Sequence, residues 1–138
     1  MKKETVDGSP ARAALIGMIT CPQVLGRVAP RWEEPGLFDA PYANLVGGWC
    51  VDFHRRYGKP PMKAVESYFH AWGEEGGKDD ATVEAVSRLL QSLAGQYERR
   101  SLEMNPDHVL DLCASYFDKV KMRRTVDSVN SAIERGDL

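Results

Sequence analysis

The amino-acid sequence predicts an all-α fold, and three observations support that prediction. Apolar residues recur at three- and four-residue spacing in each long segment, which is the period of an amphipathic helix. No segment shows the alternation of apolar and polar residues that marks a half-buried strand. Proline and glycine stand where helices would start and stop. We therefore expect a helical head of about four helices, followed by an antiparallel two-helix hairpin.

Length and composition limit the class of protein. The chain has 138 residues, of which 43% are hydrophobic and 28% charged, as in an ordinary single domain. Its net charge of -2 gives no general attraction to nucleic acid. No apolar run approaches the roughly 20 residues that span a bilayer, and no apolar stretch follows the charged N-terminus as in a secretory signal. We expect a cytoplasmic protein whose three cysteines (Cys21, Cys50 and Cys113) are buried thiols.

The head is expected over residues 9–72, after a mobile polar tail of residues 1–8. Its first helix starts at Ser9-Pro10, and a short second one follows Pro22. The third runs from Pro41, just after Asp39, to about Tyr57, and the fourth covers residues 62–72. The pair Gly47-Gly48 inside the third helix predicts a close helix crossing, with a kink as the alternative.

The hairpin is expected over residues 80–138, beyond a flexible joint at residues 73–79. Its arms, at residues 80–97 and 106–135, would be roughly 27 and 45 Å long, so the second overhangs the first beyond about residue 124. The apolar stripe of the second arm also rotates by about a third of a turn near that point. Three interpretations remain open: the overhang folds back on the head, pairs with a second chain in a four-helix arrangement, or frays.

This overhang carries the candidate binding residues. The predicted subunit interface consists of seven apolar or aromatic side chains: Tyr116, Phe117, Val120, Met122, Val126, Val129 and Ile133. Beside them lies a basic cluster that is a candidate contact for a partner protein or DNA, made of Lys119, Lys121, Arg123 and Arg124. A solvated helix face would account for the same cluster, because Asp118 and Asp127 dilute its charge.

The residue types that carry chemistry are not grouped in any motif. The sequence contains no GxxxxGK[ST], GxGxxG, HExxH or GxSxG pattern. The three histidines (His54, His70 and His108) fall on separate expected elements, without a cysteine at metal-ligand spacing. We therefore predict no catalytic, cofactor-binding or metal-binding residues.

In the order of several short motifs, this chain resembles the N-terminal domain of DnaB-type replicative DNA helicases. It would be a divergent member of the kind that phages or mobile elements carry. An early helix with Leu15-Ile16-Gly17-Met18-Ile19 is followed by Cys21-Pro22-Gln23, where the family has an apolar glycine-containing pattern and an x-P-E turn. The other matching segments are Leu37-Phe38-Asp39, Tyr57-Gly58-Lys59-Pro60-Pro61 and Arg123-Arg124-Thr125-Val126. The sequence departs from the family at Met62 and Lys63, where an acidic residue is usual, and Gly76-Gly77 is a poor counterpart of the family's Gly-Gly segment.

This resemblance implies a non-catalytic assembly and docking domain. Hairpins of that family pair between subunits, and the dimers form a collar on a hexameric ring that docks primase and loader proteins. The ATPase motor of the parent helicase would lie beyond residue 138, and DNA contact would be indirect. Two other functions remain open from the residues themselves. One is a helical nucleic-acid-binding module that uses the basic cluster, and the other is a small-molecule enzyme or regulator with a pocket between head and hairpin.

Overall fold

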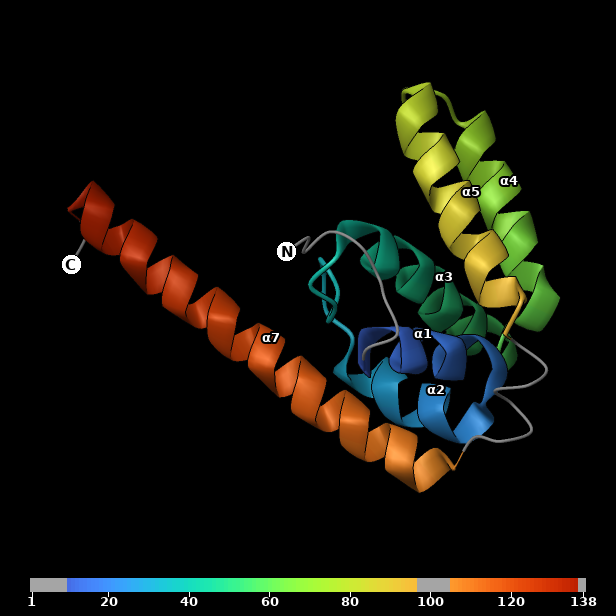
Figure 1. The fold of residues 1–138 in the computed structure, drawn as a ribbon, viewed down its shortest axis with the longest axis horizontal. Coiled ribbons are helices and arrows are strands. Elements are labelled where there is room, and N and C mark those ends of the chain that lie inside the picture. Colours follow the sequence, from blue (N-terminus) through green and yellow to red (C-terminus); the bar gives the residue numbers. More distant parts are fainter. Residues whose placement is uncertain (1–9, 97–104, 137–138) are drawn as a thin grey trace.

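The computed structural model describes residues 10–96 and 105–136, and they form α-helices and short 3-10 helices without any strand (Figure 1). The α-helices are α1 (Pro10–Thr20), α2 (Pro22–Val28), α3 (Pro41–Tyr57), α4 (Val65–Glu74), α5 (Asp80–Ala94) and α7 (Pro106–Arg135). The 3-10 helices are η1 (Ala29–Arg31) and η2 (Met62–Ala64). The all-α prediction is therefore confirmed for these residues. The expected tail at residues 1–8 lies outside them.

Helix α1 is the centre of the molecule. Every residue from Ala11 to Thr20 is buried, because α2, α3 and α7 all pack against this helix (Figure 1). We expected α1 to bury one face only, but it is buried on all sides. This is possible because the helix has almost no charged residues. Its one charged residue, Arg12, is buried and donates hydrogen bonds to Ser92 and Gln96 at the end of α5.

Most predicted helix boundaries agree with the structure, but α5 ends at Ala94 instead of residue 97, and the helix expected from residue 62 begins as η2 and continues as α4 to Glu74. Helix α3 ends at Gly58, whose φ of 71° is the left-handed conformation that glycine adopts without a steric penalty. Asp79 caps α5 by accepting a hydrogen bond from the Thr82 amide at 2.8 Å. Hydrogen bonding with the side chain of Thr82, and then with its amide, lowers the pKa of the Asp79 carboxyl. Asn105 caps α7 in the same way through the His108 amide.

The expected pairing of the last two helices is wrong. Helix α5 packs against α3 and α4, whereas α7 packs against α1 and α2 on another side of the molecule (Figure 1). Between α4 and α5, the chain reverses through Gly76 and Gly77, with φ values of 78° and 81°. Lys78 fixes this turn by donating to the Trp72 carbonyl at 2.8 Å, and its ammonium lies 5.0 Å from the Trp72 ring centroid. Both helices have apolar faces, and each buries its face against the head instead of against the other.

Gly47 does mark a close approach, although not the helix crossing that we expected. A Cβ atom at this position would lie 2.6 Å from the Trp32 ring, which comes from the loop before α3. At Gly48, by contrast, no atom would lie within 4 Å of an added Cβ. The close neighbour of α3 is thus an aromatic side chain, held between the loop and the helix.

In the part of the chain that the structure describes, no single helix is long and apolar enough to cross a membrane. Residues 10–20 and 22–31 pass this test only as a pair, and the two segments are bent by 108°.

Candidate functional site

Helix α7 has two halves that differ in burial, and the first is anchored to the body of the protein. Its buried residues are Val109, Cys113, Phe117 and Val120, which face α1 and α2. The Phe117 ring meets the Phe38 ring edge-on, with 5.3 Å between centroids. Arg31 lies over the Phe117 ring, with its guanidinium carbon 5.8 Å from the ring centroid, and it pairs with Asp118 at 3.2 Å. These contacts fix the direction in which α7 leaves the body.

The second half carries an apolar stripe that points to solvent. We call it the outward stripe: Met122, Val126, Val129 and Ile133. Their exposed fractions range from 45% to 69%. Only six large apolar side chains are exposed among the described residues, and four of them form this stripe. In Figure 1 this part of α7 projects away from the other helices.

Helix geometry explains why the stripe is exposed. Val126 and Val129 follow the buried Phe117 and Val120 by nine residues each, and Met122 follows Cys113 by the same interval. Nine residues are about two and a half turns of an α-helix, so the members of each pair lie on opposite sides. The rotation is therefore about half a turn, larger than the third of a turn expected from the sequence. The overhang does not fold back on the head.

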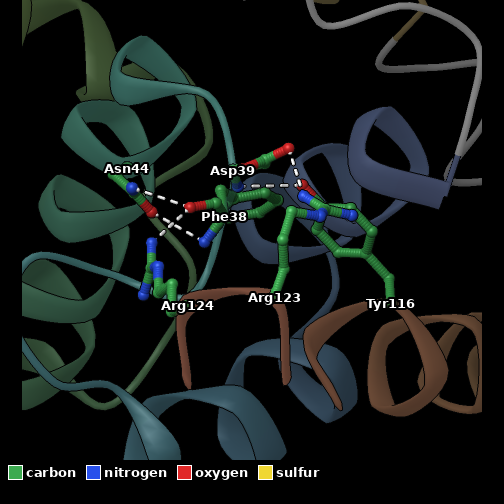
Figure 2. Close-up of polar contacts among 6 residues, drawn as sticks. All are labelled: Phe38, Asp39, Asn44, Tyr116, Arg123 and Arg124. Carbon is green, nitrogen blue, oxygen red and sulfur yellow. Dashed lines mark hydrogen bonds and ion pairs between the residues drawn. The ribbon is translucent and has the colours of Figure 1, made fainter. Parts of the chain in front are cut away.

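Polar contacts hold α7 at the point where its two halves meet. We call them the clamp: Asn44, Tyr116, Arg123 and Arg124 bind the backbone and the Asp39 carboxylate of the loop before α3 (Figure 2). Arg124 donates to the carbonyls of Gly36 at 2.6 Å and Phe38 at 2.7 Å. On the other side, Asn44 accepts from the Phe38 amide at 2.7 Å and donates to its carbonyl at 2.9 Å.

The remaining contacts of the clamp join Asp39 to Tyr116 and Arg123. The Asp39 amide donates to the Tyr116 hydroxyl at 3.0 Å, and the Asp39 carboxylate pairs with Arg123 (Figure 2). Burial raises the pKa of Tyr116, so its hydroxyl stays protonated and neutral. The clamp thus joins the loop to α3 through local hydrogen bonds of Asn44, and to α7 through contacts between residues distant in sequence.

The predicted site residues therefore divide into two groups. Met122, Val126, Val129 and Ile133 lie together and are open to solvent. Phe117 and Val120 are buried against the body, and Tyr116 is half-buried in the clamp, so these three side chains are not open to solvent as the outward stripe is. They belong to the opposite face of α7, which binds the chain's own body.

The basic cluster divides in the same way. Arg123 and Arg124 are bound by the clamp, whereas Lys119 and Lys121 are exposed on α7. The clamp is not predicted by the sequence. Its signal was the segment Leu37-Phe38-Asp39, an aromatic residue and a carboxylate in a loop, but nothing in the sequence pairs that loop with arginines more than 80 residues away.

A groove runs beside the clamp, between residues 31–37 and α7. It has a volume of about 630 Å³, and its walls include Arg31, Glu34, Pro35, Val120, Lys121 and Val129. By the boundaries expected from the sequence, this groove lies between the head, at residues 31–37, and the second arm of the expected hairpin, α7. Val129 belongs to both the groove and the outward stripe, so these two surfaces are continuous.

The side chains suited to catalysis or metal binding are dispersed or inert. Among residues 10–96 and 105–136, no three His, Cys, Asp or Glu side chains are grouped so that they could hold a metal ion. All three cysteines are buried and free. Burial raises the pKa of the Cys50 thiol, and it raises that of Cys113 to about 11, so both remain protonated and unreactive at neutral pH.

Neither a protein-family model, nor a curated protein, nor a solved structure matches this chain.

Proposed function

We propose that this chain is a non-catalytic assembly domain, which pairs with a second copy of itself through the outward stripe of α7. The single observation that carries this proposal is the exposure of four apolar side chains on one line along a projecting helix. Contiguous apolar surface of this kind is typical of protein interaction sites. The second copy offers the same surface, as a two-fold symmetric interface requires.

The spacing of the stripe supports helix pairing. Its residues follow one another at intervals of four, three and four, which is the heptad spacing of a two-helix interface. The residues on its two sides are mostly small or polar, including Thr125, Asn130 and Ala132, so another helix can approach closely. The stripe extends over twelve residues, Met122 to Ile133, or about 16 Å of helix, which is short, and we therefore expect a reversible dimer.

The anchored half of α7 also favours an assembly role. The clamp and the Phe38–Phe117 contact keep the base of the helix in one orientation. A projecting arm held in this way loses little freedom when it binds, which reduces the entropic cost of association.

The setting that we propose is the N-terminal region of a DnaB-type replicative helicase. It is supported by the order of the motifs from Leu15 to Val126, and pairing through α7 would take the place of hairpin pairing. Such dimers would build the collar of a hexamer, and the groove beside the stripe would be offered to primase or a loader protein. DNA unwinding would belong to a separate motor domain.

Analytical ultracentrifugation of the wild type and the Val126→Asp variant tests the pairing. We expect the wild type to show a concentration-dependent dimer, and the variant to remain a monomer because the interface would bury an unpaired carboxylate. Ser131→Asp is the matched control, since it adds the same charge to the exposed half of α7 away from the stripe. The proposal fails if wild type and Val126→Asp sediment as the same species at every concentration.

The alternative function, a nucleic-acid-binding module that uses the basic cluster on α7, has weaker support. Arg123 and Arg124 are bound to Asp39 and to backbone carbonyls of the loop. Only Lys119 and Lys121 are left for phosphate contacts, and Asp118 and Asp127 lie near them in sequence.

A further inference from the structure

A second exposed surface lies at the turn between α3 and α4, far from the outward stripe in sequence. We call residues 54–63 the basic turn. Its sequence, His-Arg-Arg-Tyr-Gly-Lys-Pro-Pro-Met-Lys, contains four formal positive charges and no acidic residue, in a chain whose net charge is -2. This concentration of positive charge makes the turn a candidate site for a negatively charged partner.

Three of these charges have no ion-pair partner among the described residues. Arg56 pairs with Asp52 at 3.0 Å, and the same carboxylate accepts a hydrogen bond from the Tyr68 hydroxyl at 2.6 Å. The remaining cations, Arg55, Lys59 and Lys63, are exposed. Asp52 is already occupied, and Glu66, the acid three residues after Lys63, forms no ion pair with these cations, so they are available to an external anion.

Two exposed apolar side chains stand among the cations. Tyr57 is 60% exposed and Met62 is 48% exposed, and these are the only large apolar residues outside α7 that are so open in the described part of the chain. The Tyr57 ring is supported by the Phe53 ring, with 4.5 Å between the centroids. A flat aromatic surface beside positive charges is the arrangement with which proteins bind single-stranded nucleic acids.

Helix electrostatics explains only part of this pattern. Basic residues in the last turn of α3 favour the negative end of the helix dipole, which accounts for His54, Arg55 and Arg56. Lys59 and Lys63 lie after the helix end, where that effect does not require them. The helix dipole also does not explain why Tyr57 is exposed.

The turn is held in a defined conformation. Gly58 ends α3 in the left-handed conformation, and Pro60 and Pro61, which follow it, are both buried. The Tyr68–Asp52 hydrogen bond then ties α4 to α3 just beyond the turn. The cations on either side of the prolines are therefore presented without a large loss of backbone entropy on binding.

We propose that the basic turn binds single-stranded nucleic acid, with Arg55, Lys59 and Lys63 contacting phosphates while one base stacks on Tyr57. This activity is independent of pairing through α7. A stacked base must be free of its complementary strand, so a single strand should bind more tightly than a duplex of the same length.

Fluorescence anisotropy with a labelled oligothymidylate of about 15 nucleotides, long enough for one site, tests the proposal. We expect Lys59→Gln/Lys63→Gln to weaken binding and to reduce the slope of log affinity against log salt by about 1.4, since each lost phosphate contact contributes about 0.7. Tyr57→Ala should weaken binding about tenfold through loss of stacking, whereas Tyr57→Phe should retain the affinity.

Lys119→Gln/Lys121→Gln is the matched control, because it removes two lysine charges from α7 and leaves the basic turn intact. The proposal is overturned if this control weakens binding as much as Lys59→Gln/Lys63→Gln does, or if the wild type does not bind at low salt. It is also overturned if a duplex binds as tightly as the single strand. Preferential binding to vesicles of anionic phospholipid would assign the turn to a membrane surface instead.

Discussion

Gly47 and Gly48 are neighbours on α3, but their surroundings differ completely. Alanine at position 47 would place its Cβ atom 2.6 Å from the Trp32 ring, whereas at position 48 it would meet nothing within 4 Å. The sequence predicted a close approach at this pair because glycine is costly inside a helix. It could not predict the neighbour, since the position of the Trp32 ring depends on how the following loop folds back.

Substituting each glycine by alanine separates the two roles. We expect Gly47→Ala to lower the free energy of unfolding by about 1–3 kcal/mol, because the Trp32 ring must move within a packed core. Gly48→Ala should raise it by up to about 1 kcal/mol through the better helix propensity of alanine. Urea unfolding followed by tryptophan fluorescence measures both. Equal effects of the two substitutions would contradict the observed packing of Trp32.

At the scale of single elements, the helices follow from the sequence but their neighbours do not. The range of α7, from Pro106 to Arg135, was predicted from the apolar period and is confirmed by the structure. An apolar helix face, however, predicts only that this face is buried, and not which element buries it. Val109 and Phe117 suit α1 and α2 as well as they would suit α5, and the choice depends on long-range packing.

The clamp fixes the position of α7 on the body of the protein, and Arg124 donates two of its hydrogen bonds. Arg124→Ala should leave α7 helical but remove both hydrogen bonds to the loop carbonyls, lowering the free energy of unfolding by about 1–3 kcal/mol. Circular dichroism during urea unfolding measures this change. Lys121→Ala, at an exposed neighbouring position, is the control and should shift the value by no more than about 0.5 kcal/mol. A similar loss in both variants would argue against the clamp.

For the whole molecule, the proposed dimer has a preferred orientation that the charges on α7 determine. Lys119 lies seven residues before Val126, so it falls on the line of the outward stripe. Parallel helices would bring the two copies of Lys119 together, which is unfavourable. In an antiparallel pair centred between Val126 and Val129, Met122 lies opposite Ile133, and Lys119 comes beside the turn that carries Glu134.

Cysteine crosslinking distinguishes these orientations. We expect a mixture of Met122→Cys and Ile133→Cys chains to form a disulfide-linked heterodimer under mild oxidation, whereas Met122→Cys alone should not crosslink. In the antiparallel pair, the two copies of residue 122 are about 16 Å apart along the helix, beyond the roughly 7 Å that a disulfide permits between Cα atoms. The unmodified chain controls for its three buried cysteines. Efficient crosslinking of Met122→Cys alone would show that the two helices are parallel. This result would agree with the dimer but contradict the antiparallel orientation. If the unmodified chain forms no dimer in sedimentation, the proposed interface itself is contradicted.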